Sequence, residues 1–68
     1  MISFTLSPMP LDNGQIDVVL RLYRRGKLAS VTNVATVHRS VASMVMLRCR
    51  VHLRNLGVGE ATELRTAG

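Results

Sequence analysis

The chain has 68 residues and a net charge of +5, from nine Lys and Arg against four Asp and Glu. A chain of this length forms one domain at most, so we expect a single domain over residues 1–68. One cysteine excludes an intrachain disulfide, and a reducing compartment is the default, which predicts a cytoplasmic protein. No apolar run approaches the ~18–20 residues of a membrane span, so we expect no membrane partner.

The positive charge is concentrated in the middle of the chain. No Asp or Glu occurs between Val18 and Gly59, a stretch that holds eight cations: Arg21, Arg24, Arg25, Lys27, Arg39, Arg48, Arg50 and Arg54. A folded domain rarely leaves so many guanidinium groups without an internal acidic partner. We therefore expect the counter-charge on a partner, either nucleic acid or an acidic protein surface. The alternative is a basic surface without a specific partner.

The N-terminal segment, residues 1–11, is predicted to be an extended arm. Pro8 and Pro10 exclude a regular helix there. Three apolar residues alternate with Ser and Thr, which is the pattern of a short strand: Ile2, Phe4 and Leu6.

The next segment, residues 12–26, carries helix signals at both ends. Asp12 with Gln15 three positions later resembles a capping box. Two arginines followed by Gly26 are typical of a helix C-terminus. A strand is the alternative, because Asn13-Gly14 is a good turn and the apolar residues also alternate: Ile16, Val18, Leu20 and Leu22. The signals at the two ends favour the helix.

Two further helices are predicted downstream. The three-residue spacing of Val31, Val34 and Val37 indicates a short helix over about 33–38, although β-branched residues disfavour it. The main helix is predicted over residues 41–56, with Ser40 as N-cap and Gly57 as the stop signal. A strand is the alternative for residues 47–54, because apolar and basic side chains alternate there.

The main helix has two apolar stripes. The second consists of Met44, Leu47 and Val51, and the first consists of Val37, Val41, Val45, Cys49, Leu53 and Leu56. A helix that is apolar on two sides needs two neighbours. The second stripe is therefore predicted to be an interface with another subunit or with a partner protein.

The sequence contains no set of residues that indicates catalysis. General acid–base chemistry needs a carboxylate or histidine beside a group of complementary role, and no nucleophile–base pair is found. We expect no enzymatic activity, no catalytic residue, no small-molecule substrate and no cofactor. Cys49 and His52 have the spacing of half a metal site, but a structural zinc ion needs four ligands, so no metal site is predicted.

Several phrases resemble the LuxR-type helix-turn-helix domain of bacterial response regulators, over about residues 16–65. The matching phrases are residues 19–26 with the first helix, 34–35 with the scaffold helix, 38–41 with the turn into the recognition helix, 56–58 with its end, and 62–64 with the last helix. The resemblance implies DNA binding and transcription regulation. It also implies phosphate or base contacts from Arg39, Ser40 and Ser43, and backbone contacts from Arg48 and Arg50.

The favoured fold is therefore all-α: a small helical bundle of helix-turn-helix type, with an extended arm (1–11), a folded core (12–65) and a frayed tail (66–68). The alternative is an α+β fold, in which an N-terminal β-hairpin of residues 2–7 and 15–24 packs on one long C-terminal helix and the protein is a homodimer.

The favoured function is that of a small basic protein that binds DNA through its phosphates. The residues predicted to make those contacts are Arg39, Ser40, Ser43, Arg48, Arg50 and Arg54. The alternative is a protein-interaction module or inhibitor, of the type of a phage or accessory regulator. It would form homo-oligomers and bind an acidic protein surface through apolar stripes fringed by Arg.

Overall fold

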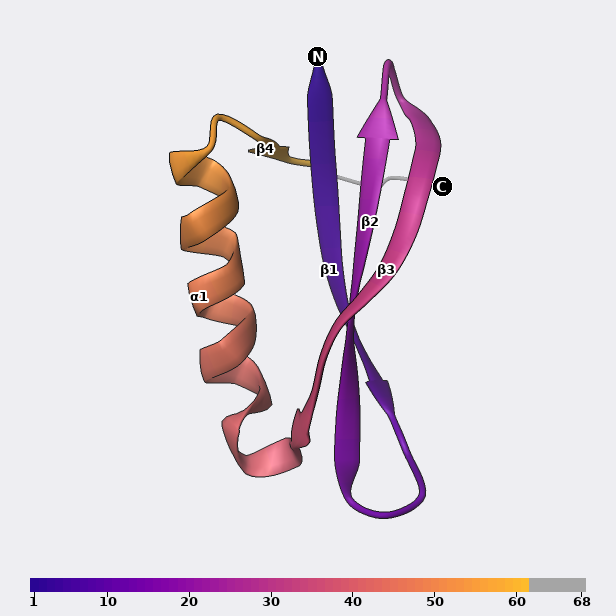
Figure 1. Cartoon of the computed structure of the whole chain (residues 1–68), viewed down its shortest axis with the longest axis vertical. Coiled ribbons are helices and arrows are strands. Elements are labelled where there is room, and N and C mark those ends of the chain that lie inside the picture. Colours follow the sequence, from indigo (N-terminus) through magenta and orange to yellow (C-terminus); the bar gives the residue numbers. More distant parts are fainter. Residues whose placement is uncertain (62–68) are drawn as a thin grey trace.

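Three long antiparallel strands, one α-helix and a short fourth strand make up residues 1–61, the part of the chain described by the computed structural model (Figure 1). In chain order the elements are β1 (Ile2–Pro10), β2 (Gln15–Arg24), β3 (Lys27–His38), the 3-10 turn η1 (Arg39–Val41), α1 (Ala42–Asn55) and β4 (Gly59–Glu60). The strands lie in the order β3-β2-β1-β4, with β4 parallel to β1. The helix lies along one side of this sheet.

The predicted all-α bundle is wrong, because most of residues 2–38 form strands and α1 is the one α-helix within residues 1–61. The α+β alternative describes the chain better, since a β1–β2 hairpin and one C-terminal helix are both present. It lacked the third long strand, β3, which pairs with β2 over most of its length. The short helix predicted over 33–38 lies within β3 and is also wrong.

The signals that favoured a helix over residues 12–26 are turn signals. Arg25 and Gly26 have φ of 53° and 78°, which makes them the two-residue turn between β2 and β3. Left-handed residues end helices and form tight hairpins alike, so Gly26 fits both structures. At the other end, the Gln15 backbone N–H donates to Asn13 Oδ1 (3.1 Å), which closes the β1–β2 turn.

The predicted N-terminal arm is an inner strand of the sheet, which corrects that prediction. Phe4 in β1 is completely buried and pairs with Leu22 of β2. β4 covers the other edge of β1 only at Ser3 and Phe4. Pro8 and Pro10 lie beyond the two residues that pair with β4. No β4 residue pairs with β1 at these positions, so the missing backbone N–H of proline leaves no acceptor of β4 without a hydrogen bond. The predicted tail, 66–68, lies outside the described residues.

The core lies between α1 and one face of the sheet. Its fully buried side chains are Phe4 and Val18, with Leu6 and Ala42 nearly so. The apolar residues packed around it from α1 are Val45, Met46, Cys49 and Leu53. Val37, Val45, Cys49 and Leu53 of the first predicted stripe pack on the core as expected, whereas Val41 and Leu56 of that stripe are exposed and Met46 joins the core instead.

The ends of α1 differ from each other. The predicted cap, Ser40, instead contacts the His38 ring, whose Nδ1 accepts from the Ser40 backbone N–H (3.2 Å) and lies 2.8 Å from the Ser40 hydroxyl. The predicted stop at Gly57 is confirmed. Its φ of +87° lets Val58 N–H donate to the Leu53 carbonyl (3.0 Å). Within residues 1–61, no helix is long and apolar enough to cross a membrane.

Candidate functional site

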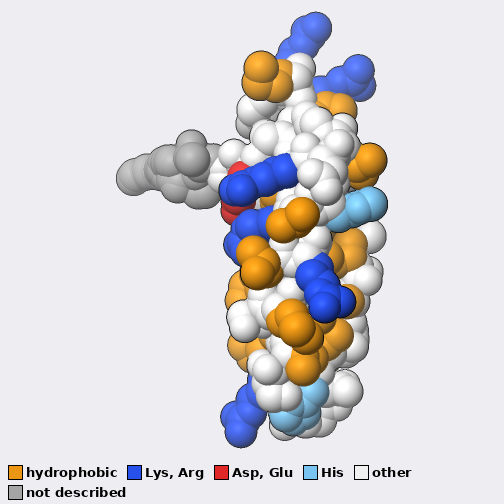
Figure 2. All heavy atoms as spheres, turned by 90° about the vertical axis from the view of Figure 1, so that its left-hand side faces the viewer, with side chains coloured by type: hydrophobic (Ala, Val, Ile, Leu, Met, Phe, Trp, Pro, Cys, Tyr) orange, Lys and Arg blue, Asp and Glu red, His pale blue; other side chains and the backbone are white. Residues whose placement is uncertain are grey.

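The outer face of α1 carries a line of exposed apolar side chains, which we call the outer stripe: Met44, Leu47 and Val51. Their exposed fractions are 48%, 59% and 49%. Spacings of three and four residues place them on one line along the helix. Because Cys49 and Leu53 face the core, this line points away from the sheet. Figure 2 faces this side of the molecule and shows hydrophobic side chains running along it between basic ones.

The six residues predicted to contact nucleic acid do not share one face. The flank of α1 that faces β4 carries Ser43, Arg50 and Arg54. The two arginines on this flank contact Glu60 of β4. Arg48 lies on the opposite flank, beside His52 and Val34 of β3. Arg39 and Ser40 precede the helix in η1. The basic residues therefore border the outer stripe on both sides instead of forming a single row.

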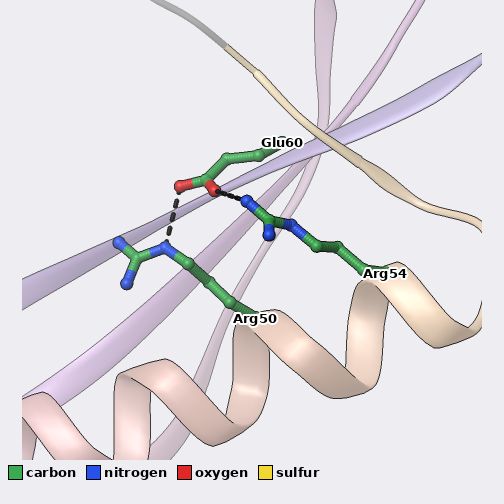
Figure 3. A network of polar contacts seen from close by, with 3 residues as sticks. All are labelled: Arg50, Arg54 and Glu60. Atoms are coloured by element: carbon green, nitrogen blue, oxygen red, sulfur yellow. Dashed lines mark hydrogen bonds and ion pairs between the residues drawn. The ribbon is translucent and has the colours of Figure 1, made fainter.

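Glu60 in β4 lies between two of these arginines (Figure 3). Its Oε2 accepts from Arg50 Nε at 2.8 Å, and its Oε1 accepts from Arg54 Nη2 at 3.3 Å. The hydrogen bond from Arg50, helped by the charges of both arginines, holds the pKa of the Glu60 carboxyl below its ordinary value. The expectation that no arginine has an internal acidic partner is thus wrong for Arg50 and Arg54.

Sequence reasoning missed Glu60 because it lies outside the acid-free stretch. A signal was available, since the two arginines are four residues apart and the chain reverses at Gly57 just before the carboxylate. The two contacts of Glu60 tie β4 to the C-terminal half of α1. They also leave Arg48 as the α1 arginine without an ion pair among residues 1–61.

Replacing Glu60 with Gln is expected to lower the free energy of unfolding at neutral pH by about 0.5–1 kcal/mol, because exposed ion pairs contribute little even as a network. A carboxyl whose pKa is lowered by folding stabilises the protein above its ordinary pKa of 4.5 and stops doing so as the pH falls through the folded value. The difference between variant and wild type should therefore disappear in acid. Urea denaturation at neutral and acidic pH measures it.

Asp12→Asn is the matched control, because it removes one negative charge from an exposed turn residue that forms no ion pair within residues 1–61. It should leave the unfolding midpoint nearly unchanged at both pH values. A Glu60→Gln effect that persists in acid would contradict the ion-pair explanation.

A groove lies on the flank of α1 that faces β3. Its volume is about 360 Å³, and its lining residues come from all three long strands and the helix: Leu6, Leu20, Val34, Arg48, Cys49, His52 and Leu53. Most of this lining is apolar, with Arg48 and His52 as its charged or polar members. Sequence reasoning did not find the groove, because it assigned Val34 to a helix and could not place β3 beside α1.

Comparison of the chain with family models, with curated proteins and with solved structures gave no match. The helix-turn-helix fold implied by the LuxR-type resemblance is absent from residues 1–61, because residues 19–26 and 34–35 lie in or between strands. The phrase 62–64 lies outside the described residues. No group of three or more His, Cys, Asp or Glu side chains within residues 1–61 could hold a metal ion.

Proposed function

We propose that this protein is a protein-interaction module that docks through the outer stripe onto an apolar protein surface bordered by carboxylates. The observation that supports this most is the position of Met44, Leu47 and Val51. They are about half exposed on a helix whose other side is already packed on the sheet. Apolar side chains aligned in this way are typical of a helix that binds a groove or another helix.

The charges beside the outer stripe favour a partner with carboxylates. Arg48 borders the stripe on one flank, and Arg54, with 64% of its side chain exposed, borders it on the other. α1 itself contains no Asp or Glu. Two copies packed stripe to stripe would bring arginines together, which disfavours self-association through this face. An acidic border on the partner pairs with the same arginines.

The outer stripe is expected to contribute a modest but measurable part of the free energy of partner binding. Full burial of one aliphatic or Met side chain stabilises by ~1.5–3 kcal/mol, and these three start about half exposed. Burying the remainder of all three contributes on the order of 3 kcal/mol, which corresponds to roughly a hundredfold in affinity.

Met44→Asp and Val51→Asp are each expected to abolish partner binding, because each places a charged carboxylate within the apolar contact. Quantitative affinity capture compares the wild type with both variants, and a partner counts only if both variants lose it. Binding of that purified partner is then measured directly, with an expected loss of about thirtyfold or more.

Asn13→Asp is the matched control, because it adds the same charge to an exposed turn residue outside α1. It should retain the partner. If both stripe variants bind every candidate as well as the wild type does, the outer stripe is not an interface and this proposed function fails.

Nucleic-acid binding is the second candidate function. It is favoured by the eight cations against three carboxylates within residues 1–61, since such an excess attracts phosphate without any particular fold. Size-exclusion chromatography with light scattering, run with a mixed-sequence duplex of roughly 20–30 base pairs, separates the two candidates. A complex that weakens steeply with salt supports nucleic-acid binding, whereas a protein that ignores DNA at low salt supports the protein-interaction module.

A further inference from the structure

The two edges of the sheet are protected unequally. On the β1 side, β4 covers the first residues and Pro8 and Pro10 interrupt the rest. On the other side, β3 is the outermost of the four described strands, and its residues from 27 to 34 are all exposed. Leu28–Val37 contains no proline and no charged residue. Natural proteins usually protect an edge strand with prolines, charged residues, bulges or a covering element. Of these, β3 has only two irregularities in its pairing with β2.

The groove beside this edge adds side-chain pockets to the exposed backbone. Val34 belongs to β3 and lines the groove, and the residue is 41% exposed. A strand added to β3 would project alternate side chains toward the side of the sheet where α1 lies. A partner that binds by strand addition uses both the exposed backbone edge and the groove. Main-chain hydrogen bonds to the edge give affinity, and pockets for alternate side chains give specificity.

The charges around the groove select the kind of strand that fits. Arg48 lines the groove and forms no ion pair within residues 1–61. Lys27 begins β3 and Arg39 follows its end. In an antiparallel pair of two β3 strands, the Lys27 end of one copy would lie near the Arg39 end of the other. A second copy therefore meets like charges at both ends, whereas an acidic strand meets opposite ones.

We propose that β3 and the adjacent groove bind an extended segment of a partner protein that carries apolar residues and Asp or Glu on one face, two residues apart. The segment adds a strand to β3, its apolar side chains enter the groove, and a carboxylate pairs with Arg48. This site shares Arg48 with the border of the outer stripe, but its strand edge and its apolar lining lie on the sheet side of α1, so Val34→Asn tests it separately.

The probe for this site is a peptide of about ten residues, within the usual range of strand lengths, with the repeat Thr-Val-Thr-Glu, which places Val and Glu on the same face. Titrated into the ¹⁵N-labelled protein, it is expected to give saturable shifts of amide resonances along residues 28–34 and at Arg48. Val34→Asn and Arg48→Gln should each weaken its binding about tenfold, by removing the apolar contact and the ion pair. The same peptide with Lys in place of each Glu should bind at least about tenfold more weakly.

Val51→Asn is the matched control for Val34→Asn, because it makes the same replacement on the outer stripe and should leave peptide binding unchanged. Each variant is first checked for a wild-type pattern of amide resonances, so that unfolding is not mistaken for lost binding. No saturable shift up to about 1 mM peptide, equal binding of the Lys-containing peptide, or shifts away from β3 would overturn the proposal. Shifts of the β3 amides that grow with protein concentration alone would place a second copy on this edge and overturn it too.

Discussion

Replacing Phe4 with Ala is expected to leave most of the protein unfolded at 25 °C. Phe4 is completely buried in an inner strand and is the largest side chain of a core that has few members. Removing a buried Phe costs about 3–5 kcal/mol through lost transfer energy and the cavity left behind. A chain of this size has a total stability of only about 3–5 kcal/mol, so one such cavity consumes it. Urea denaturation followed by far-UV circular dichroism measures the effect.

Ile2→Ala is the control for Phe4→Ala, because Ile2 lies on the same face of β1 but is 48% exposed. Its unfolding free energy should fall by less than about 1 kcal/mol, since much of the side chain is already in water. A Phe4→Ala variant with the wild-type midpoint would show that the core is not centred on β1. It would then favour the peripheral arm predicted from the sequence.

Val18→Asp is expected to destabilise the protein at least as much as Phe4→Ala does. Val18 is completely buried in β2, opposite Ala35 of β3, and no cation lines that part of the core. Burying an unpaired carboxylate costs several kcal/mol, which exceeds what a domain of this size can lose. We expect a protein without cooperative unfolding, which circular dichroism during heating and the dispersion of amide resonances would both show.

Val19→Asp is the matched control, because it makes the same substitution at the next residue of β2. Successive side chains of a strand point to opposite faces, so this carboxylate lies on the face away from α1. The variant should fold and lose about 1 kcal/mol or less through lower strand propensity. Equal damage at both positions would contradict the assignment of one buried and one open face to the sheet.

The small core and the exposed apolar surface have a common consequence. Few side chains are buried, while the outer stripe, the groove and the edge of β3 leave many apolar groups in water. A partner that binds only the folded chain stabilises it by mass action. We therefore expect the stability of this protein to rise on binding at either surface, and the two proposed surfaces give two independent ways to observe it.

The local sequence alone determined most of α1. The spacing of the apolar residues and the stop at Gly57 predicted a helix over 41–56, and the structure has it over Ala42–Asn55. The same periodicity separated the core-facing stripe from the outer one. These features are readable because every backbone hydrogen bond of a helix joins residues four apart, so the pattern that decides the helix lies within it.

Only the tertiary structure decided the sheet and everything built on it. The segments of β2 and β3 form strands because their residues pair with residues far away in the sequence. Val18 of β2, for example, pairs with Pro8 and with Ala35. The Arg50–Glu60 contact and the groove at Val34 depend on the same long-range arrangement. A strand's hydrogen bonds and its buried face are supplied by neighbours that local patterns do not identify, and turn residues such as Gly26 suit a hairpin and a helix end equally well.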